Sequence, residues 1–124
     1  MNCIFCENKK AIIENSLAYV RMVDIGYEVV KGHALIMPHR HVDSFFEINE
    51  AERIAMFSLL DQIKIMLDEK HLPDGYNIGF NCGEVAGQTI MHAHMHIIPR
   101  YLGDVKEASK SGIEEGIALS MRIT

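Results

Sequence analysis

The sequence predicts an α+β fold in which an antiparallel sheet packs against one long helix. Two apolar segments, 17–26 and 33–38, have the composition of strands and end at a glycine or a proline. A helical period begins at Asn49, and two further segments after it alternate in polarity as strands do. With 124 residues, of which 48% are apolar, the chain has the size and composition of a single domain, 1–124.

The long helix is marked at both ends. Asn49 followed by Glu52 forms the pattern of a capping box, and the sequence from Pro73 to Gly75 stops the helix. Between these signals, apolar side chains recur every three or four residues, at Ile54, Phe57, Leu60, Ile63 and Leu67. We expect these positions to form the buried face of the helix.

The last two strands carry the most informative pattern. Residues 76–81 alternate apolar and small polar side chains, which predicts a half-buried strand, and a glycine-rich loop then leads into the segment HAHMHII. Alternate side chains of a strand point to the same face, so three histidines share one face with about 6.6–6.8 Å between neighbours. They are His92, His94 and His96. The intervening residues, Ala93, Met95 and Ile97, are expected to point into the core.

Three histidines in register on an apolar strand favour a chemical role over a merely solvated face. A purely metal-binding role, as in cupins or in barrel amidohydrolases, fits poorly. The chain is too short for a barrel of eight strands and eight helices, and the only carboxylate within ten residues after the histidines is Asp104.

Charge and cysteine content narrow the function classes. A net charge of −5 and a pI near 5.7 argue against generic binding to nucleic acid or to an anionic membrane. We find no apolar run of membrane-spanning length and no signal peptide, so we expect a cytoplasmic protein. Cys3 and Cys6 form a C-x-x-C pair, which in such a chain indicates a metal or redox role; Cys82 is expected to be a small packed residue.

The segment H-A-H-M-H-I-I resembles the H-φ-H-φ-H-φ-φ signature of the histidine triad (HIT) superfamily of nucleotidyl hydrolases and transferases. The segments "VDIGYEVVKGHALIMPHRHV" and "FNCGEVAGQTIMHAHMHIIPRY" resemble the two halves of the family domain, and "CIFC" extends the likeness from residue 3 to about 104. The resemblance implies a HIT-like fold, with a five-stranded antiparallel sheet, one long helix and a short second helix. It also implies a homodimer that pairs through the long helix and a sheet edge.

The resemblance assigns roles to the histidines. In the family the middle histidine attacks the α-phosphate of a nucleotide and forms a nucleotidyl-histidine intermediate, which water then cleaves. That role falls on His94, and a neutral imidazole is a good nucleophile near pH 7. The last histidine, His96, is expected to contact the phosphate near the leaving group. His33, beside Gly32, is expected to be a structural hydrogen-bonding residue.

Further residues match family positions that bind the substrate, a purine nucleotide. Phosphate is expected to be bound by Asn81, Gln88 and Thr89, with Gly83 and Gly87 giving backbone amides access to the anion. Asp24 matches the acidic residue that binds the ribose hydroxyls. The base pocket would be lined by Ile4, Phe5 and Met22, for which a plain core role is the alternative.

A structural zinc site is implied by one branch of the family, the zinc-binding bacterial-type branch of these Hint- and Fhit-like hydrolases. Its four ligands correspond to Cys3, Cys6, His41 and His92, all of which are present. Cysteine and histidine are the usual ligands of tetrahedral zinc. Two reduced, partly buried thiols are the alternative.

The expected activity is cleavage at the α-phosphate of nucleoside phosphoramidates, adenylated small molecules or dinucleoside polyphosphates. Family members active on polyphosphates carry a basic segment after R-Y-x-G-D, whereas Glu114 stands here, and an acid there repels an additional phosphate. We therefore expect phosphoramidates or monophosphate esters to be favoured. A nucleotide-binding regulatory or scaffold protein with little turnover, or a nucleotidyltransferase, is the alternative.

Overall fold

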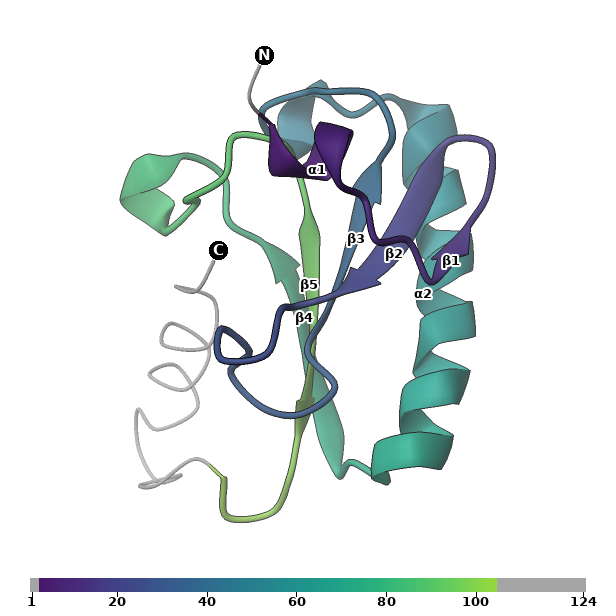
Figure 1. Ribbon diagram of the computed structural model, residues 1–124, viewed down its shortest axis with the longest axis vertical. Helices are drawn as coiled ribbons and strands as arrows, with labels where there is room; N and C mark the ends of the chain where they lie inside the picture. Colours follow the sequence, from purple (N-terminus) through teal and green to yellow (C-terminus); the bar gives the residue numbers. More distant parts are fainter. Residues whose placement is uncertain (1–2, 105–124) are drawn as a thin grey trace.

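The computed structural model describes residues 3–104, and within them five strands form one antiparallel sheet in the order β1-β2-β3-β5-β4. The strands are β1 (Ile13–Glu14), β2 (Ala18–Met22), β3 (Ala34–Pro38), β4 (Gly75–Phe80) and β5 (Met95–Arg100). The helices are α1 (Ile4–Glu7) and α2 (Glu50–His71), with short 3₁₀ turns η1 (Phe45–Glu47) and η2 (Glu84–Ala86). The predicted α+β fold, with one long and one short helix, is confirmed (Figure 1).

The sheet has two different faces. We call the side covered by α2 the helix face; its strand residues are Ala18, Val20, Met22, Ala34, Ile36, Met95 and Ile97. The opposite side, which we call the site face, contacts α1 and carries Tyr19, Arg21, Leu35, Met37 and His96. Side chains alternate between faces along each strand, so every strand contributes to both. Both faces are buried along β2 and β3.

Helix α2 begins as predicted. The Asn49 side chain accepts a hydrogen bond from the Glu52 amide at 2.8 Å, and the Glu52 carboxylate accepts one from the Asn49 amide at 3.1 Å. The helix ends at His71, and its C-cap, Leu72, adopts a left-handed conformation immediately before Pro73. Both ends therefore follow the capping rules that the sequence indicated.

The predicted buried face of α2 is only partly right. Ile63 and Leu67 are buried with Met56 and Leu59 against the helix face of the sheet, and Leu60 is half-buried beside them. Ile54 and Phe57 are instead 62% and 52% exposed. The helix carries apolar residues on two overlapping stripes, and the sheet covers the stripe at 56, 59, 63 and 67.

No helix in the described part of the chain is long and apolar enough to cross a membrane.

The last strand is shorter than predicted. Strand β5 starts at Met95, so His92 and His94 precede it and only His96 lies within it. The Ala93 amide donates to the carbonyl of Val42, which is in the loop after β3, instead of to a paired strand. The alternation nevertheless continues into the loop, because Ala93, Met95 and Ile97 all pack in the core of the helix face, as predicted.

Candidate active site

The three histidines meet on the site face beside α1. The rings of His94 and His96 lie 5.1 Å apart between centroids, and the Phe5 ring contacts His92 at 5.8 Å and His94 at 5.2 Å. All three histidines are buried. Phe5 of α1 thus lies against His92 and His94. Strands β3 and β4 flank His96 in the sheet, where it is paired with Leu35 and Gly79.

The orientation of His94 is set by its neighbour. His94 Nδ1 lies 2.7 Å from the carbonyl oxygen of His92. A carbonyl can only accept a hydrogen bond, so Nδ1 carries the proton and the lone pair of the neutral ring lies on Nε2. In this tautomer Nε2 is the ring atom of His94 whose lone pair is available to a base, a nucleophile or a ligand.

His33 and His96 form a directed hydrogen-bonded pair. The Val29 amide donates to His33 Nδ1 at 3.2 Å, so the neutral His33 ring carries its proton on Nε2, 3.0 Å from His96 Nδ1. The proton of His96 is therefore on Nε2, and this atom is buried with no hydrogen-bond partner among residues 3–104. A buried donor without a partner is costly, so His96 Nε2 is suited to an acceptor supplied by a ligand.

Burial keeps this pair neutral. Desolvation, with a smaller contribution from the nearby His94, lowers the pKa of His33 to about 4 and that of His96 to about 3. His33 lies directly before β3 and follows Gly32, whose φ of +91° suits glycine. A Cβ at Gly32 would lie 2.9 Å from the His71 ring and 3.0 Å from Pro99, so no larger residue fits before His33.

A second cluster lies next to the histidines. Single ligand atoms of Cys3, Cys6, His41 and His92 all lie within 4.8 Å of one another. His92 Nδ1 is 3.5 Å from both sulfurs, and Cys6 Sγ is 3.5 Å from His41 Nδ1. A tetrahedral zinc with bonds of about 2.3 Å to sulfur and 2.0–2.1 Å to nitrogen separates such atoms by about 3.5 Å. The donor set and its spacing therefore fit zinc.

His92 belongs to both clusters. Its Nε2 donates to the Pro38 carbonyl at 2.8 Å, which leaves the lone pair on Nδ1, the atom facing the two cysteines. A hydrogen-bonded second nitrogen of this kind is typical of metal-ligating histidines. Burial raises the pKa of the Cys6 thiol, with further contributions from Cys3. Cys6 therefore favours the thiol form until a cation is present to stabilise its thiolate.

The loop before the histidines is organised by Gln88. Its side-chain oxygen accepts from the Gly83 amide at 2.8 Å, and its Nε2 donates to the carbonyls of Asp43 and Ile90 at 2.6 and 3.0 Å. Gln88 is buried, and both of its amide hydrogens are directed to carbonyls within the protein. In this structure Gln88 shapes the loop, while Gly83 and Gly87 adopt positive φ values of 94° and 103° on either side of η2. Asn81 follows directly after β4.

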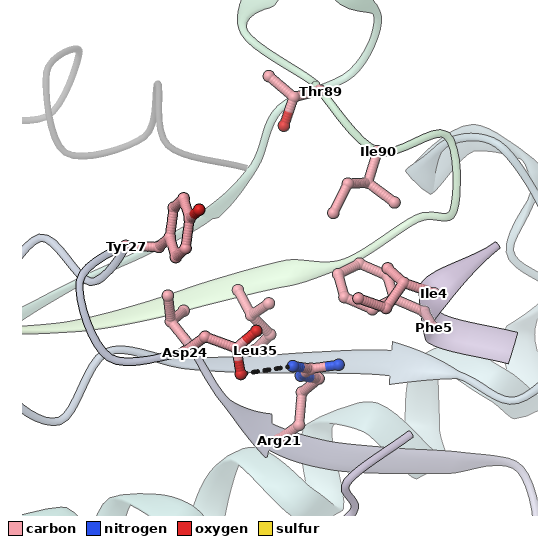
Figure 2. Close-up of a pocket in the computed structure, with 9 residues that line it drawn as sticks. Ile4, Phe5, Arg21, Asp24, Tyr27, Leu35, Thr89 and Ile90 are labelled. Atoms are coloured by element: carbon pink, nitrogen blue, oxygen red, sulfur yellow. Dashed lines mark hydrogen bonds and ion pairs between the residues drawn. The ribbon is translucent and has the colours of Figure 1, made fainter. Parts of the chain in front are cut away.

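A pocket of about 400 Å³ opens on the site face (Figure 2). Four residues that the sequence assigned to the substrate line it: Ile4, Phe5, Asp24 and Thr89. Five others were not predicted: Arg21, Val23, Tyr27, Leu35 and Ile90. Met22, which the sequence assigned to the base pocket, does not line it. Side chains alternate along β2, so Met22 packs on the helix face while its neighbour Arg21 faces the pocket. The feature that could have indicated a functional role for Arg21 is its charge within the apolar segment AYVRMV.

Two cations hold Asp24 at the mouth of this pocket. Its Oδ1 accepts from Lys10 Nζ at 3.2 Å and from Arg21 Nη2 at 3.1 Å. The hydrogen bond from Lys10 is the largest contribution to a pKa that lies below the usual value, and Arg21 adds to it. The carboxylate is therefore ionised at neutral pH and positioned from one side. Glu114, on which the substrate preference depends, lies outside the described residues.

The HIT domain family matches residues 7–103 of this chain. The chain belongs to the HIT family. Protein hit of Bacillus subtilis is 35% identical over 105 residues, which cover 81% of this chain and 72% of that protein. The crystal structure of a HIT family protein from Bacillus anthracis superimposes with a TM-score of 0.76 at 32% identity, over 92% of this chain and 85% of the other.

Two relatives have named activities. An adenosine 5'-monophosphoramidase of Schizosaccharomyces pombe is 27% identical over 108 residues, covering 81% of this chain and 75% of that protein. An asymmetrical bis(5'-nucleosyl)-tetraphosphatase of the same yeast is 32% identical over 79 residues, covering 64% of this chain and 43% of that protein. HIT proteins thus include nucleotide hydrolases, which supports nucleotide hydrolysis in general for this chain.

Proposed function

We propose that this HIT protein is a nucleotidyl hydrolase that cleaves its substrate at the α-phosphate through His94. The observation that carries the proposal is the 2.7 Å hydrogen bond from His94 Nδ1 to the His92 carbonyl, which places the reactive lone pair on Nε2. The His96 Nε2 proton, buried beside it, supports the same conclusion because it suits a phosphate oxygen.

The reaction has two displacements. In the first, the lone pair of His94 Nε2 forms a bond to the α-phosphorus, and the bond from phosphorus to the leaving group breaks. The leaving group departs with that electron pair. In the second, water attacks phosphorus, the phosphorus–nitrogen bond breaks, and the nucleoside monophosphate leaves while His94 regains its lone pair. The attacking water releases one proton to solvent, and the leaving group takes up one proton from solvent in place of its bond to phosphorus. Throughout, His96 donates to a phosphate oxygen and His33 holds His96 in the required tautomer.

The pocket accounts for the nucleoside. Asp24, held ionised by two cations, would accept hydrogen bonds from the ribose hydroxyls, and the apolar walls at Ile4, Phe5 and Leu35 would contact a purine. Thr89 on the opposite wall and Asn81 at the end of β4 would bind phosphate together with the backbone around Gly83 and Gly87. For Gln88 we propose support of this loop rather than a direct contact with phosphate.

We further propose that the chain belongs to the zinc-binding branch of the family, with Cys3, Cys6, His41 and His92 as ligands of a structural zinc. When bound, the ion would supply a cross-link between α1 and the histidine loop. The thiols at Cys3, Cys6 and Cys82 are free, which suits the reducing cytoplasm.

We also propose a homodimer. The exposed stripe at Ile54 and Phe57 lies on the outer side of α2, and β4 forms one edge of the sheet. An exposed apolar patch and an unpaired strand edge are surfaces on which a second copy can pack.

Trapping the intermediate tests the mechanism. A substrate labelled in the α-phosphate, quenched within the first turnover, should leave acid-labile nucleotide on the protein at His94, and His94→Ala should abolish both the label and turnover while binding nucleotide within about tenfold of the wild type. Label on His96, or full activity of the alanine variant, would contradict the assignment. Tight binding of nucleotide without turnover of any substrate would favour the regulatory alternative.

The same assay addresses the leaving group. Nucleoside phosphoramidates should show a higher kcat/KM than diadenosine tetraphosphate, because Glu114 replaces the basic residue expected there. Glu114→Arg should narrow the difference. A wild type that prefers the tetraphosphate would show that the polyphosphate class is the substrate, and label transferred to a sugar phosphate would indicate a transferase.

A further inference from the structure

Arg21 is an unusual residue for a strand in the middle of a sheet. It lies in β2 with buried apolar neighbours, and only 2% of its surface is exposed. Its side chain rises on the site face and lines the pocket between Asp24 and the pair Ile4 and Phe5 (Figure 2). A buried guanidinium is costly unless its hydrogen bonds are made, so its partners show what it can do.

Three of the five N–H groups of Arg21 are used within the described residues. Nη1 donates to the Asn8 carbonyl at 3.1 Å, Nη2 donates to Asp24 Oδ1 at 3.1 Å, and Nε is 3.4 Å from the Met22 carbonyl. Each terminal nitrogen of a guanidinium carries two hydrogens. One donor on Nη1 and one on Nη2 therefore have no partner in residues 3–104, in a side chain that borders the pocket.

The position of Arg21 relative to the substrate follows from the proposed function, on which this inference rests. Phosphate lies at His94 and His96, and the ribose lies at Asp24. The base must then extend between the apolar walls formed by Ile4, Phe5 and Leu35. Arg21 contacts Asp24 directly and has its guanidinium carbon 5.5 Å from the centre of the Phe5 ring, so it borders the base on the edge next to Phe5.

A guanidinium presents only donors to that edge. The O6 and N7 atoms of guanine or hypoxanthine are both acceptors and match two N–H groups of an arginine. Adenine replaces O6 by an amino group, which is a donor and would oppose the guanidinium. We propose that Arg21 makes the nucleoside pocket select 6-oxopurine nucleotides over adenine nucleotides.

The competing explanation is that Arg21 acts only through Asp24. In that case removal of Arg21 weakens every ribonucleotide equally, because all of them share the ribose. Lys10 offers a matched control, since it contacts the same Asp24 oxygen at 3.2 Å and does not line the pocket. The two explanations therefore differ in the ratio of affinities for two bases and not in the absolute affinity.

Calorimetric titration of GMP, IMP, AMP and UMP provides the test. The wild type should bind GMP and IMP equally and at least about fivefold more tightly than AMP, the lower end of the discrimination expected from two such hydrogen bonds. Arg21→Met, which keeps the length and apolar contacts of the side chain, should bring the GMP to AMP ratio within twofold. Lys10→Met should weaken GMP and AMP by the same factor and leave the ratio unchanged.

Several results would overturn the inference. They are a wild type that binds AMP as tightly as GMP, a ratio that survives Arg21→Met, or tighter binding of UMP than of either purine. If Arg21→Met fails to fold, Arg21→Lys replaces it. A lysine keeps a positive charge beside Asp24 but lacks the two parallel N–H donors of a guanidinium, so it should also lower the ratio of GMP to AMP affinity. Failure of all four nucleotides to bind would contradict the nucleotide function itself, whereas equal binding would contradict only the role of Arg21.

Discussion

The two faces of the sheet are built by different means. On the helix face, Val20, Ile36 and Ile97 pack against α2 through apolar contacts that depend on little more than shape and volume. On the site face, hydrogen bonds between segments far apart in the chain position the functional groups, as between His33 and His96. The difference indicates that substitutions on the helix face should lower stability and leave the chemistry unchanged, whereas substitutions on the site face can change both.

The largest effect on stability is expected from the helix face. Ile63→Ala removes a buried side chain from the contact between α2 and the sheet and should lower the free energy of unfolding by about 2–5 kcal/mol. Ile25→Ala, which removes the same atoms from an isoleucine that is 95% exposed and lies outside α2, is the control and should change it by less than about 0.5 kcal/mol. Urea denaturation measures both. A folded Ile63→Ala protein that also loses nucleotide affinity would show that the faces are not separable.

The next effect concerns the metal cluster, which joins α1 to the site face. Purified protein should contain about one zinc per chain by elemental analysis. Cys6→Ala should lose the metal and lower Tm by several degrees, because a ligand that binds only the folded state stabilises it. Cys82→Ala removes a cysteine outside the cluster and should retain the ion. Wild-type protein that contains no zinc, and whose Tm does not change when zinc is added, would contradict the zinc proposal.

The smallest effect is a pH dependence that belongs to the site face. Imidazoles of the unfolded chain titrate near 6.5, whereas burial lowers the pKa of His33 to about 4 and of His96 to about 3. Between pH 6.5 and 4 the unfolded state therefore binds more protons. The contribution of these two histidines to the free energy of unfolding is complete above pH 6.5. It decreases as the pH falls, by up to about 1.4 kcal/mol per pH unit for each histidine.

His33→Gln isolates this contribution. Burial also lowers the pKa of His71 and His92, so the wild type loses stability in this window from more than one imidazole. The glutamine variant should show a shallower decrease in the urea midpoint between pH 6.5 and 5, a range above the titration of the carboxylates. If the urea midpoint of both proteins changed equally with pH, folding would not lower the pKa of His33.

Local signals in the sequence predicted the parts of the structure that depend on local rules. The Asn49–Glu52 capping box lies within four residues, and the alternation of Ala93, Met95 and Ile97 follows from strand geometry. The buried stripe of α2 did not follow, because Met56 and Leu59 compete with Ile54 and Phe57 on a helix with apolar residues around much of its circumference. Which stripe the sheet covers is a tertiary property.

The parts of the site that were missed depend on long-range contacts. Both faces of β2 are buried, so its pattern does not reveal that Arg21 faces the pocket and Met22 faces α2. The hydrogen bond from Gln88 to the carbonyl of Asp43 joins residues 45 positions apart, and no local pattern indicates it. The family resemblance named the histidines and the metal ligands, but their tautomers required the positions of Val29, Pro38 and the His92 carbonyl.

The order of residues in α1 has a thermodynamic consequence. Ile4 and Phe5, which line the nucleoside pocket, are the two residues between the paired cysteines Cys3 and Cys6. A four-residue helix without a side-chain cap has little stability of its own, so whatever fixes its cysteines also fixes the pocket wall. Linkage between two binding sites is reciprocal. An ion that raises the affinity for nucleotide by some factor is therefore bound more tightly, by the same factor, when nucleotide is present. If the four residues bind zinc as proposed, the affinity of this protein for nucleotide also depends on the free zinc concentration around it.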